Sequence, residues 1–250
     1  MKMYEKDNML YFTREGEIVR LSACGKDSLR FQASPNCTIS EQDFTLMPQN
    51  ATAEISISEN QASIQNGALR ADIYGNGRVE YFYRGQKILR EKSELAFDAG
   101  IRNYINNCGQ LWRARVTFEA NQGEHFYGLG HEATDCFDLK GCTIDLRHVN
   151  AKCTIPYIYS SLGYGFLWNL PSTGTCELAG NRTRWTSDST RQIDYVIIGG
   201  SPRQACETLA DLTGHAPQLP DWALGFWQSR LRYETQEQVL ETASKYYEHG

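Results

Sequence analysis

Short runs of alternating hydrophobic and polar residues fill the chain from residue 10 to about residue 200. The clearest run is "RARVTFE", in which Ala114, Val116 and Phe118 share one face, as in a half-buried strand. Glycine-containing turns separate the runs further upstream, at Asn66-Gly67, Asn76-Gly77 and Arg84-Gly85. Asn-Gly is the strongest short hairpin signal. Many short strands at turn-length spacing predict a mostly β chain built as an antiparallel sandwich.

The periodicity becomes helical after residue 200. In "SPRQACETLADLTG", Ser201 is expected as the N-cap, Pro202 takes the first helical position and Gln204 completes a capping box. Gly214 stands where the helix should end. The residues expected on the apolar face of this helix are Ala205, Cys206, Leu209 and Leu212. A helix over residues 201–214 is therefore predicted to follow the strands.

A proline-bounded connector, "HAPQLP", comes next and is typical of a domain boundary. The following run, "DWALGFWQS" (residues 221–229), is nearly continuously apolar, which predicts a strand buried on both faces of a parallel sheet. A second capping box, Thr235 with Gln238, then begins a helix for which Gly250 stands at the C-cap position. We therefore expect a β-sandwich domain over residues 1–217. Residues 218–250 are expected to be the first β/α unit of a truncated second domain.

The composition argues against several classes of function. The chain has 250 residues, of which 41% are hydrophobic and 22% charged, with a net charge of -5 at pH 7. Its basic residues are scattered, unlike the basic stripe of a nucleic-acid-binding protein, and no apolar stretch approaches the length needed to span a bilayer. The N-terminal segment is not a signal peptide, and the eight cysteines contain no CxxC pair, so they are interpreted as reduced thiols of a cytoplasmic protein. The sequence leaves open whether the protein forms a homo-oligomer.

Three stretches, taken in order, resemble one family of enzymes. They are "FYGLG" (Phe126 to Gly130), "IPYIYSSLGYGFLWNLP" (Ile155 to Pro171) and "DYVIIGGSPRQACETLADLTGHAPQLPDWALGFWQSRLRY" (Asp194 to Tyr233). Together they resemble the N-terminal part of glycoside hydrolase family 31, whose members include α-glucosidases and α-xylosidases. The resemblance covers residues 53 to 250, and the ordered run of three motifs makes it specific.

The resemblance implies a galactose-mutarotase-like β-sandwich followed by a (β/α)8 barrel that carries a retaining mechanism. Such a mechanism uses two carboxylates about 5 Å apart. One attacks the anomeric carbon, and the other protonates the leaving oxygen and then activates water. In this family both are aspartates on barrel strands well past the first, so both are expected beyond residue 250. The chain is therefore expected to hold no catalytic residue and to be inactive alone.

As part of a longer enzyme, the chain is expected to act on terminal α-linked glucose or xylose in small saccharides. The residues that size the sugar pocket are expected mostly beyond it, so α-glucosidase and α-xylosidase both stay open. A transglycosylase of the same family would share the glycosyl-enzyme and differ in its acceptor. If the natural chain ended at residue 250, the alternative would be a non-catalytic carbohydrate-binding or interaction module.

Two regions supply candidate substrate-binding residues. Arg230 and Arg232 follow the first expected barrel strand and would lie at the active-site face, where a guanidinium can fork onto sugar hydroxyls or a neighbouring carboxylate. In the segment "DLRHVNAKC", Asn150 and His148 stand, with Arg147, where relatives place an aspartate near the sugar. The alternatives are a structural ion pair for each arginine and a plain turn role for the asparagine.

The segment "GLGHEATDCFDLKG" brings several metal-ligating residue types together in the sequence. They are His131, Glu132, Asp135, Cys136, Asp138 and Cys142. Their spacing fits no standard zinc pattern, and the family that the chain resembles requires no such metal, so no metal site and no cofactor are expected. The sequence also lacks a G-x-S-x-G elbow, a Walker loop and a full G-x-G-x-x-G, which argues against serine hydrolase and nucleotide chemistry.

Overall fold

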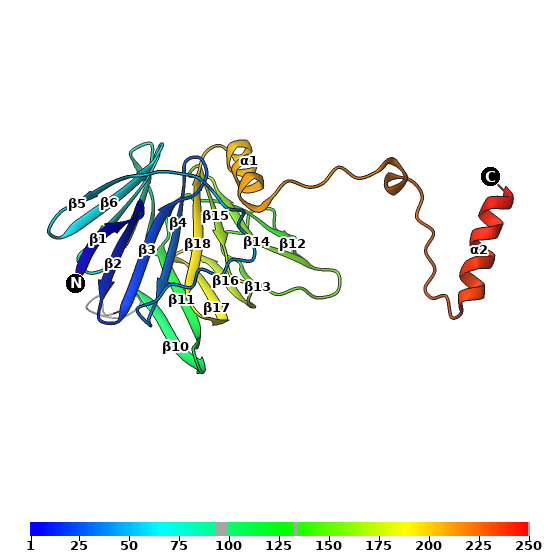
Figure 1. The fold of residues 1–250 in the computed structure, drawn as a ribbon, viewed down its shortest axis with the longest axis horizontal. Coiled ribbons are helices and arrows are strands. Elements are labelled where there is room, and N and C mark those ends of the chain that lie inside the picture. The colour runs from blue at the N-terminus through cyan, green and yellow to red at the C-terminus, as the bar shows by residue number, and fades with distance from the viewer. Residues whose placement is uncertain (94–99, 133–134, 250) are drawn as a thin grey trace. The chain divides into compact units, whose positions relative to one another are not determined.

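The computed structural model describes residues 1–93, 100–132 and 135–249. The chain divides into two units, Met1–His215 and Ala216–Gly250. In the described residues the first unit consists of antiparallel sheets followed by one α-helix, whereas the regular elements of the second are helical (Figure 1). The mostly β fold class and the antiparallel sandwich that the alternating runs predicted are confirmed.

The largest sheet has eight strands, all paired antiparallel. In spatial order they are β1 (Lys2–Lys6), β2 (Met9–Arg14), β3 (Glu17–Ala23), β4 (Ser28–Ser34), β18 (Ile193–Gly199), β15 (Tyr164–Trp168), β14 (Cys153–Ser160) and β12 (Phe126–His131). Because β4 pairs with β18, the start and the end of the first unit meet in the middle of this sheet (Figure 1).

Two smaller sheets complete the first unit. One is ordered β10 (Arg102–Cys108), β11 (Leu111–Glu119), β17 (Arg182–Thr190), β16 (Gly174–Ala179) and β13 (Thr143–Leu146). The other is ordered β5 (Glu54–Ile57), β6 (Gln61–Asn66), β7 (Leu69–Tyr74), β8 (Val79–Tyr83) and β9 (Gln86–Arg90). The three predicted glycine turns join β6 to β9 in succession, and their glycines, Gly67, Gly77 and Gly85, all have positive φ.

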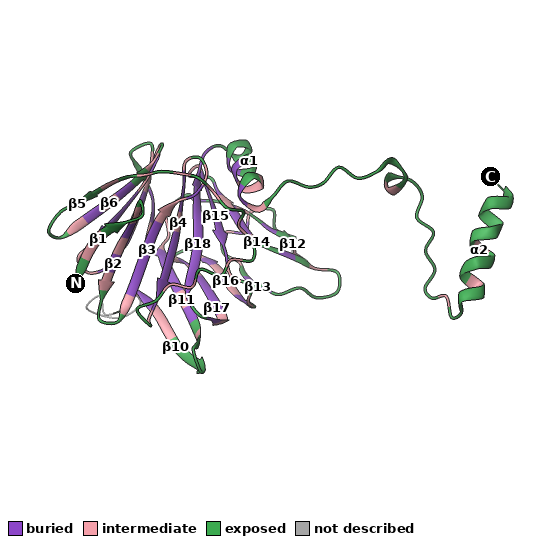
Figure 2. Cartoon of the chain, viewed as in Figure 1, coloured by how far each residue is buried: buried purple, intermediate pink, exposed green. Residues whose placement is uncertain are grey.

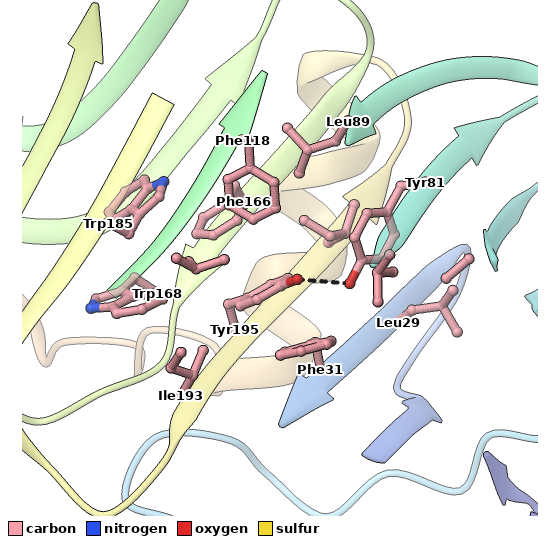
Figure 3. Packing of buried hydrophobic residues seen from close by; sticks show 14 of the residues in the cluster. Leu29, Phe31, Tyr81, Leu89, Phe118, Phe166, Trp168, Trp185, Ile193 and Tyr195 are labelled. Atoms are coloured by element: carbon pink, nitrogen blue, oxygen red, sulfur yellow. Dashed lines mark hydrogen bonds between the residues drawn. The ribbon is translucent and has the colours of Figure 1, made fainter. Parts of the chain in front are cut away.

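One hydrophobic core is shared by all three sheets. The predicted face of β11 is correct, because Ala114, Val116 and Phe118 are fully buried. The ring of Tyr195 on β18 stacks on Phe31, with centroids 4.6 Å apart. Its hydroxyl lies 3.0 Å from the hydroxyl of Tyr81 on β8 (Figure 3). Burying each large apolar side chain contributes about 1.5–3 kcal/mol, so this shared core supplies most of the driving force for folding.

A buried arginine joins the three sheets. Arg102, at the start of β10, is 1% exposed. Its Nε and Nη2 donate to the two oxygens of Glu17 on β3, both at 2.8 Å. Its Nη1 donates to Glu91, which follows β9, at 2.6 Å, and Nη2 also donates to the carbonyl of Gly77 at 3.1 Å. One guanidinium therefore satisfies acceptors from both other sheets.

The charges of this network stabilise one another. Burial opposes the charged form of Arg102, but the carboxylates of Glu17 and Glu91 hold the pKa of Arg102 well above its usual range. Burial also raises the pKa of Glu91, and the hydrogen bonds that it accepts from Arg102 and from the Val79 amide oppose that rise. The geometry is therefore that of an ionised carboxylate bound to a buried cation.

The outer face of the largest sheet is partly covered by α1 (Pro202–Thr213). Its predicted capping box is confirmed, because Ser201 and Gln204 exchange side chain to backbone hydrogen bonds. Leu212 and Ala205 are buried, as expected, but Cys206 is exposed and that prediction was wrong. Thr208 is buried instead, because the buried stripe runs through positions 205, 208 and 212 and leaves 206 on its flank.

The second unit corrects one predicted element. Residues 221–229 were expected to form a strand, but Asp221–Leu224 form a 3-10 helix and residues 225–235 are irregular. A strand needs a hydrogen-bonded neighbour, and the described residues of this unit contain no other strand. Most of the segment is exposed (Figure 2). Its exposed residues include the large apolar side chains of Trp222, Phe226 and Trp227.

The final helix is present as α2 (Gln236–His249). The Gln238 amide donates to Thr235, as a capping box requires, but the Gln238 side chain accepts from the amide of Glu234. The expected C-cap, Gly250, lies outside the described residues. In the part of the chain that the structure describes, neither α1 nor α2 has the length and apolarity of a membrane-crossing helix.

Removing the buried arginine tests how much the three-sheet junction depends on it. We expect Arg102→Met to lower the free energy of unfolding by about 3–5 kcal/mol, because the buried carboxylate of Glu91 and the part-buried carboxylate of Glu17 would lose their cation. The control is Arg191→Met at an exposed position, which should change stability by less than about 0.5 kcal/mol. Urea denaturation of the chain measures both. A loss below about 1 kcal/mol for Arg102→Met would show that the junction does not rest on this ion pair.

Candidate functional site

A distorted strand pair explains the "FYGLG" motif. Gly128 faces Ile158 and Gly130 faces Thr154, so two steps along β12 correspond to four along β14. Pro156 lies within this bulge, where a missing N–H removes no ladder hydrogen bond. Gly128, Leu129 and Gly130 all have positive φ. A Cβ atom on Gly130 would lie 2.2 Å from the Cys153 carbonyl oxygen, so only glycine allows the two backbones to approach this closely.

The carboxylate of Glu132, just past this bulge, binds residues at the base of a loop. The Oε2 atom of Glu132 lies 2.7 Å from Nζ of Lys152. The same ammonium donates to the carbonyl of Asp145 at 2.6 Å. The hydroxyl of Thr154 lies 3.2 Å from Oε1 of Glu132 and 3.1 Å from the carbonyl oxygen of Arg147. These contacts close residues 145–154 into a loop, called here the 145–154 loop.

The 145–154 loop carries two of the predicted substrate-binding residues. Asn150 and Ala151 form its tip, between the bridged residues Val149 and Lys152. The Asn150 side chain is exposed, as a ligand contact requires. His148 is also exposed, and its Nδ1 atom lies 3.3 Å from the Thr154 amide that donates to it. Because Nδ1 acts as the acceptor, the proton of the neutral imidazole is on Nε2, which can then donate to a hydroxyl.

A hollow of about 270 Å³ lies beside this loop. It is lined by residues 146–148, by Thr154, Pro156 and Trp168, and by residues 170–173. The polar groups around it are a guanidinium, an imidazole and the hydroxyls of Thr154, Ser172 and Thr173. A hollow lined by several hydrogen-bonding groups suits a polyhydroxy ligand. The first unit therefore presents a polar loop and a hollow at one place.

The two predicted arginines belong to the second unit. Arg230 and Arg232 are exposed and lie in the irregular segment before α2. The guanidinium carbon of Arg230 lies 5.7 Å from the ring centroid of Tyr233, a cation–π contact within the same segment. The expected position of Arg230 and Arg232 at the active-site face stays a prediction.

The metal-ligating residue types that are close in the sequence are brought together only in part, because Cys142 contacts Cys136 while Glu132 and Asp138 bind other partners. Glu132 binds Lys152, whereas Asp138 accepts from Nδ1 of His125 at 2.6 Å and from the amides of Phe126 and Lys140. Slight burial raises the pKa of Asp138, but the hydrogen bonds from His125 and the two amides lower it below its usual range. Among the described residues, no three such side chains come together as a metal ion would require.

A second polar network lies on the outer face of the largest sheet. Arg30 binds the buried Asp194 through two hydrogen bonds, of 3.0 and 2.5 Å, and also pairs with Asp43 at 2.7 Å. Arg20 pairs with Glu41 at 2.5 Å. Asp43 and Glu41 belong to a segment that crosses this face between β4 and β5. These groups pair with one another, so holding that segment accounts for the network without a ligand.

The pairing of Lys152 with Glu132 was not predicted from the sequence. Glu132 was weighed as a metal ligand, and Lys152 was not singled out. Twenty residues separate them, and only the pairing of β12 with β14 brings them together. The one available signal was the glycine pair of "GLG", which indicates close approach of two backbones but not which side chains that approach joins.

Comparisons with known proteins give the class of the chain. No family model matches it. A protein of Pseudescherichia vulneris, described as an uncharacterized family 31 glucosidase, is 33% identical over 268 residues, which cover 98% of this chain and 50% of that protein. Alpha-xylosidase A of Aspergillus niger is 36% identical over 148 residues, or 58% of this chain and 20% of the xylosidase. The chain thus spans about half the length of the first relative and less of the second.

A solved structure extends the similarity to the fold. The crystal structure of an α-xylosidase from a soil metagenome, complexed with xylose, matches 100% of this chain and 40% of its own chain, with a TM-score of 0.88 and 30% identity. The fold of the chain is therefore similar to that of part of an α-xylosidase chain. The chain is a relative of the family 31 enzymes, and the relationship predicted from the three motifs is confirmed.

Proposed function

We propose that the chain is part of a longer retaining α-glycosidase that removes terminal α-linked glucose or xylose from small saccharides. The observation that carries this proposal is the 33% identity to a family 31 glucosidase across 98% of the chain. Because the chain spans only half of that relative, we assign the nucleophile and the acid/base carboxylate to residues beyond it. The chemistry would be the two-carboxylate displacement of retaining glycosidases, with carboxyl groups about 5 Å apart.

In this proposal the chain contributes sugar recognition. The amide of Asn150 and the Nε2–H of His148 are hydrogen-bonding groups on one exposed loop. Arg232 would add a charged donor from the segment before α2. Such groups fix the orientation of sugar hydroxyls before the displacement, and good orientation is itself a large part of catalysis.

We further propose that xylose is preferred to glucose at the terminal position. The Aspergillus niger relative at 36% identity is named an α-xylosidase, and the similar solved structure is that of an α-xylosidase with xylose bound. Xylose differs from glucose by the absence of one hydroxymethyl group. A pocket that fills this space excludes glucose, and a group of that size changes selectivity by about 1–3 kcal/mol.

The direct test compares the complete protein with residues 1–250. We expect the complete protein to hydrolyse an aryl α-xyloside faster than the matching α-glucoside and to release the α-anomer first, as proton NMR would record. Residues 1–250 alone should show no turnover above background, because both carboxylates would be missing. Turnover by residues 1–250 that survives repurification would place the nucleophile within them. Absence of turnover by the complete protein would favour a binding module.

Two substitutions in the complete protein test the recognition residues. Arg232→Ala should lower kcat/KM by about tenfold to a hundredfold, or about 1.4–2.8 kcal/mol of transition-state binding. Asn150→Ala should act in the same direction but more weakly, because a neutral hydrogen bond contributes less than a charged one. The exposed Arg203→Ala on α1 is a matched control and should leave kcat/KM unchanged.

Thermal melts separate binding from structure in this series. The loss of a sugar contact should leave the unfolding midpoint of Arg232→Ala close to that of the unmodified protein. A large fall in the midpoint would instead assign Arg232 to a structural ion pair, because breaking a buried pair costs several kcal/mol. Unchanged kcat/KM for both variants would remove Arg232 and Asn150 from the site.

A further inference from the structure

We propose that the ion pair between Glu132 and Lys152 is the device that positions the 145–154 loop, and that Lys152 is a positioning residue for saccharide recognition. The second part rests on the proposed function, because it takes the exposed tip of the loop as the face that meets the sugar. The first part concerns this chain alone.

The tip of the loop has almost no packing of its own. Residues 147–151 are all exposed, and the side chains buried nearest to them on either side are Leu146 and Thr154. A loop without buried apolar contacts opens easily. What holds this one is polar, because Lys152 reaches both the Asp145 carbonyl and the Glu132 carboxylate from within the loop itself.

The ion pair is shielded enough to be effective. The side chains of Glu132 and Lys152 are 6% and 16% exposed, respectively. Charges in such a site attract each other more strongly than a surface pair, for which water and salt screen the interaction. The remaining oxygen of Glu132 lies within hydrogen-bonding distance of Thr154, whose hydroxyl is also near the Arg147 carbonyl. The carboxylate therefore contacts Lys152 and Thr154 near one end of the loop, and these two residues in turn bind the carbonyls of Asp145 and Arg147 near the other end.

The backbone explains why the carboxylate stands there. Three successive residues with positive φ, Gly128 to Gly130, precede Glu132, and the middle one is a fully buried leucine. A non-glycine residue in this conformation is strained, and such strain is kept where the surrounding structure requires it. Bulges of this kind re-aim the side chains that follow. Glu132 follows this bulge, and its side chain is buried at the base of the loop.

A preformed loop changes recognition in a defined way. His148 and Asn150 would be presented in one arrangement before the sugar arrives, so less conformational freedom is lost on binding. Without the ion pair the same side chains remain, but the loop must be ordered during binding. The effect should therefore appear in KM more than in kcat.

Hydrogen exchange on the chain itself tests the first part. The reporters are the amides of Arg147 and Thr154, which are hydrogen-bonded within the loop to Asp145 and His148. Lys152→Met and Glu132→Gln should each speed their exchange by about tenfold or more, whereas core amides of β11 and β18 keep their rates. The double variant should exchange no faster than either single variant, because both remove the same interaction.

Two controls accompany the exchange measurement. Lys152→Arg keeps the charge and should stay within about threefold of the unmodified chain. Lys26→Met removes an exposed lysine from the β3–β4 turn and should change neither reporter. Unchanged exchange of Arg147 and Thr154 in both Lys152→Met and Glu132→Gln would overturn the proposal.

Kinetics of the complete protein test the second part. Lys152→Met should raise KM about tenfold and leave kcat within about twofold, and Lys152→Arg should restore most of the KM. Faster loop exchange with an unchanged KM would overturn the positioning role. If the unmodified complete protein hydrolysed no α-glycoside, the proposed function alone would fall, because the exchange result still decides whether the pair holds the loop.

Discussion

A single buried cation determines how the three sheets meet. Arg102 lies on β10 and donates hydrogen bonds to Glu17 of the largest sheet. It also donates to Glu91 and to the Gly77 carbonyl, which belong to the sheet of β5 to β9. Apolar packing alone is non-directional and tolerates small shifts between sheets. A buried charge does not tolerate such shifts. Any displacement leaves the charge or its carboxylates without partners, which costs several kcal/mol. The ion pairs thus select one arrangement among those that the apolar core would allow.

An ion pair also positions the backbone at the candidate site. The 145–154 loop has little apolar surface to bury, so its position depends on Lys152 and the carboxylate of Glu132. That carboxylate is placed by the bulge of β12, and β12 is in turn an edge strand of the sheet that Arg102 anchors through Glu17. Rigid sheets with polar loops held by ion pairs suit a surface that recognises hydroxyl-rich ligands, because such ligands reward fixed hydrogen-bonding groups.

Local patterns in the sequence predicted the local structure well. Alternation located the buried face of β11, glycine turns located the hairpins from β6 to β9, and the capping box located α1. Residues 221–229 were wrongly predicted as a strand because a short apolar run reports burial and not hydrogen-bond pairing. Cys206 was misplaced because four apolar positions cover a wider stripe than the one that α1 buries.

Local sequence patterns could not predict ion pairs between residues that are far apart in the chain. Arg30 and Asp194 are 164 residues apart, and the pairing of Lys152 with Glu132 depends on a bulge that no periodicity announces. The candidate residues Asn150 and His148 were found through the family resemblance, and the structure places them on one exposed loop. The ion pair beneath them was not predicted, since a charged pair carries no sequence pattern unless its members are close in the chain.

Because a shared core and the buried Arg102 join them, the three sheets of the first unit should form one cooperative body. Native-state hydrogen exchange of ladder amides in β7, β11 and β18 tests it most directly, because these strands belong to the three different sheets. The account predicts one common opening free energy for the three strands, equal to the global free energy of unfolding. Opening of β7 at a clearly lower free energy, while β11 and β18 stay protected, would contradict it by showing that the sheet of β5 to β9 unfolds alone.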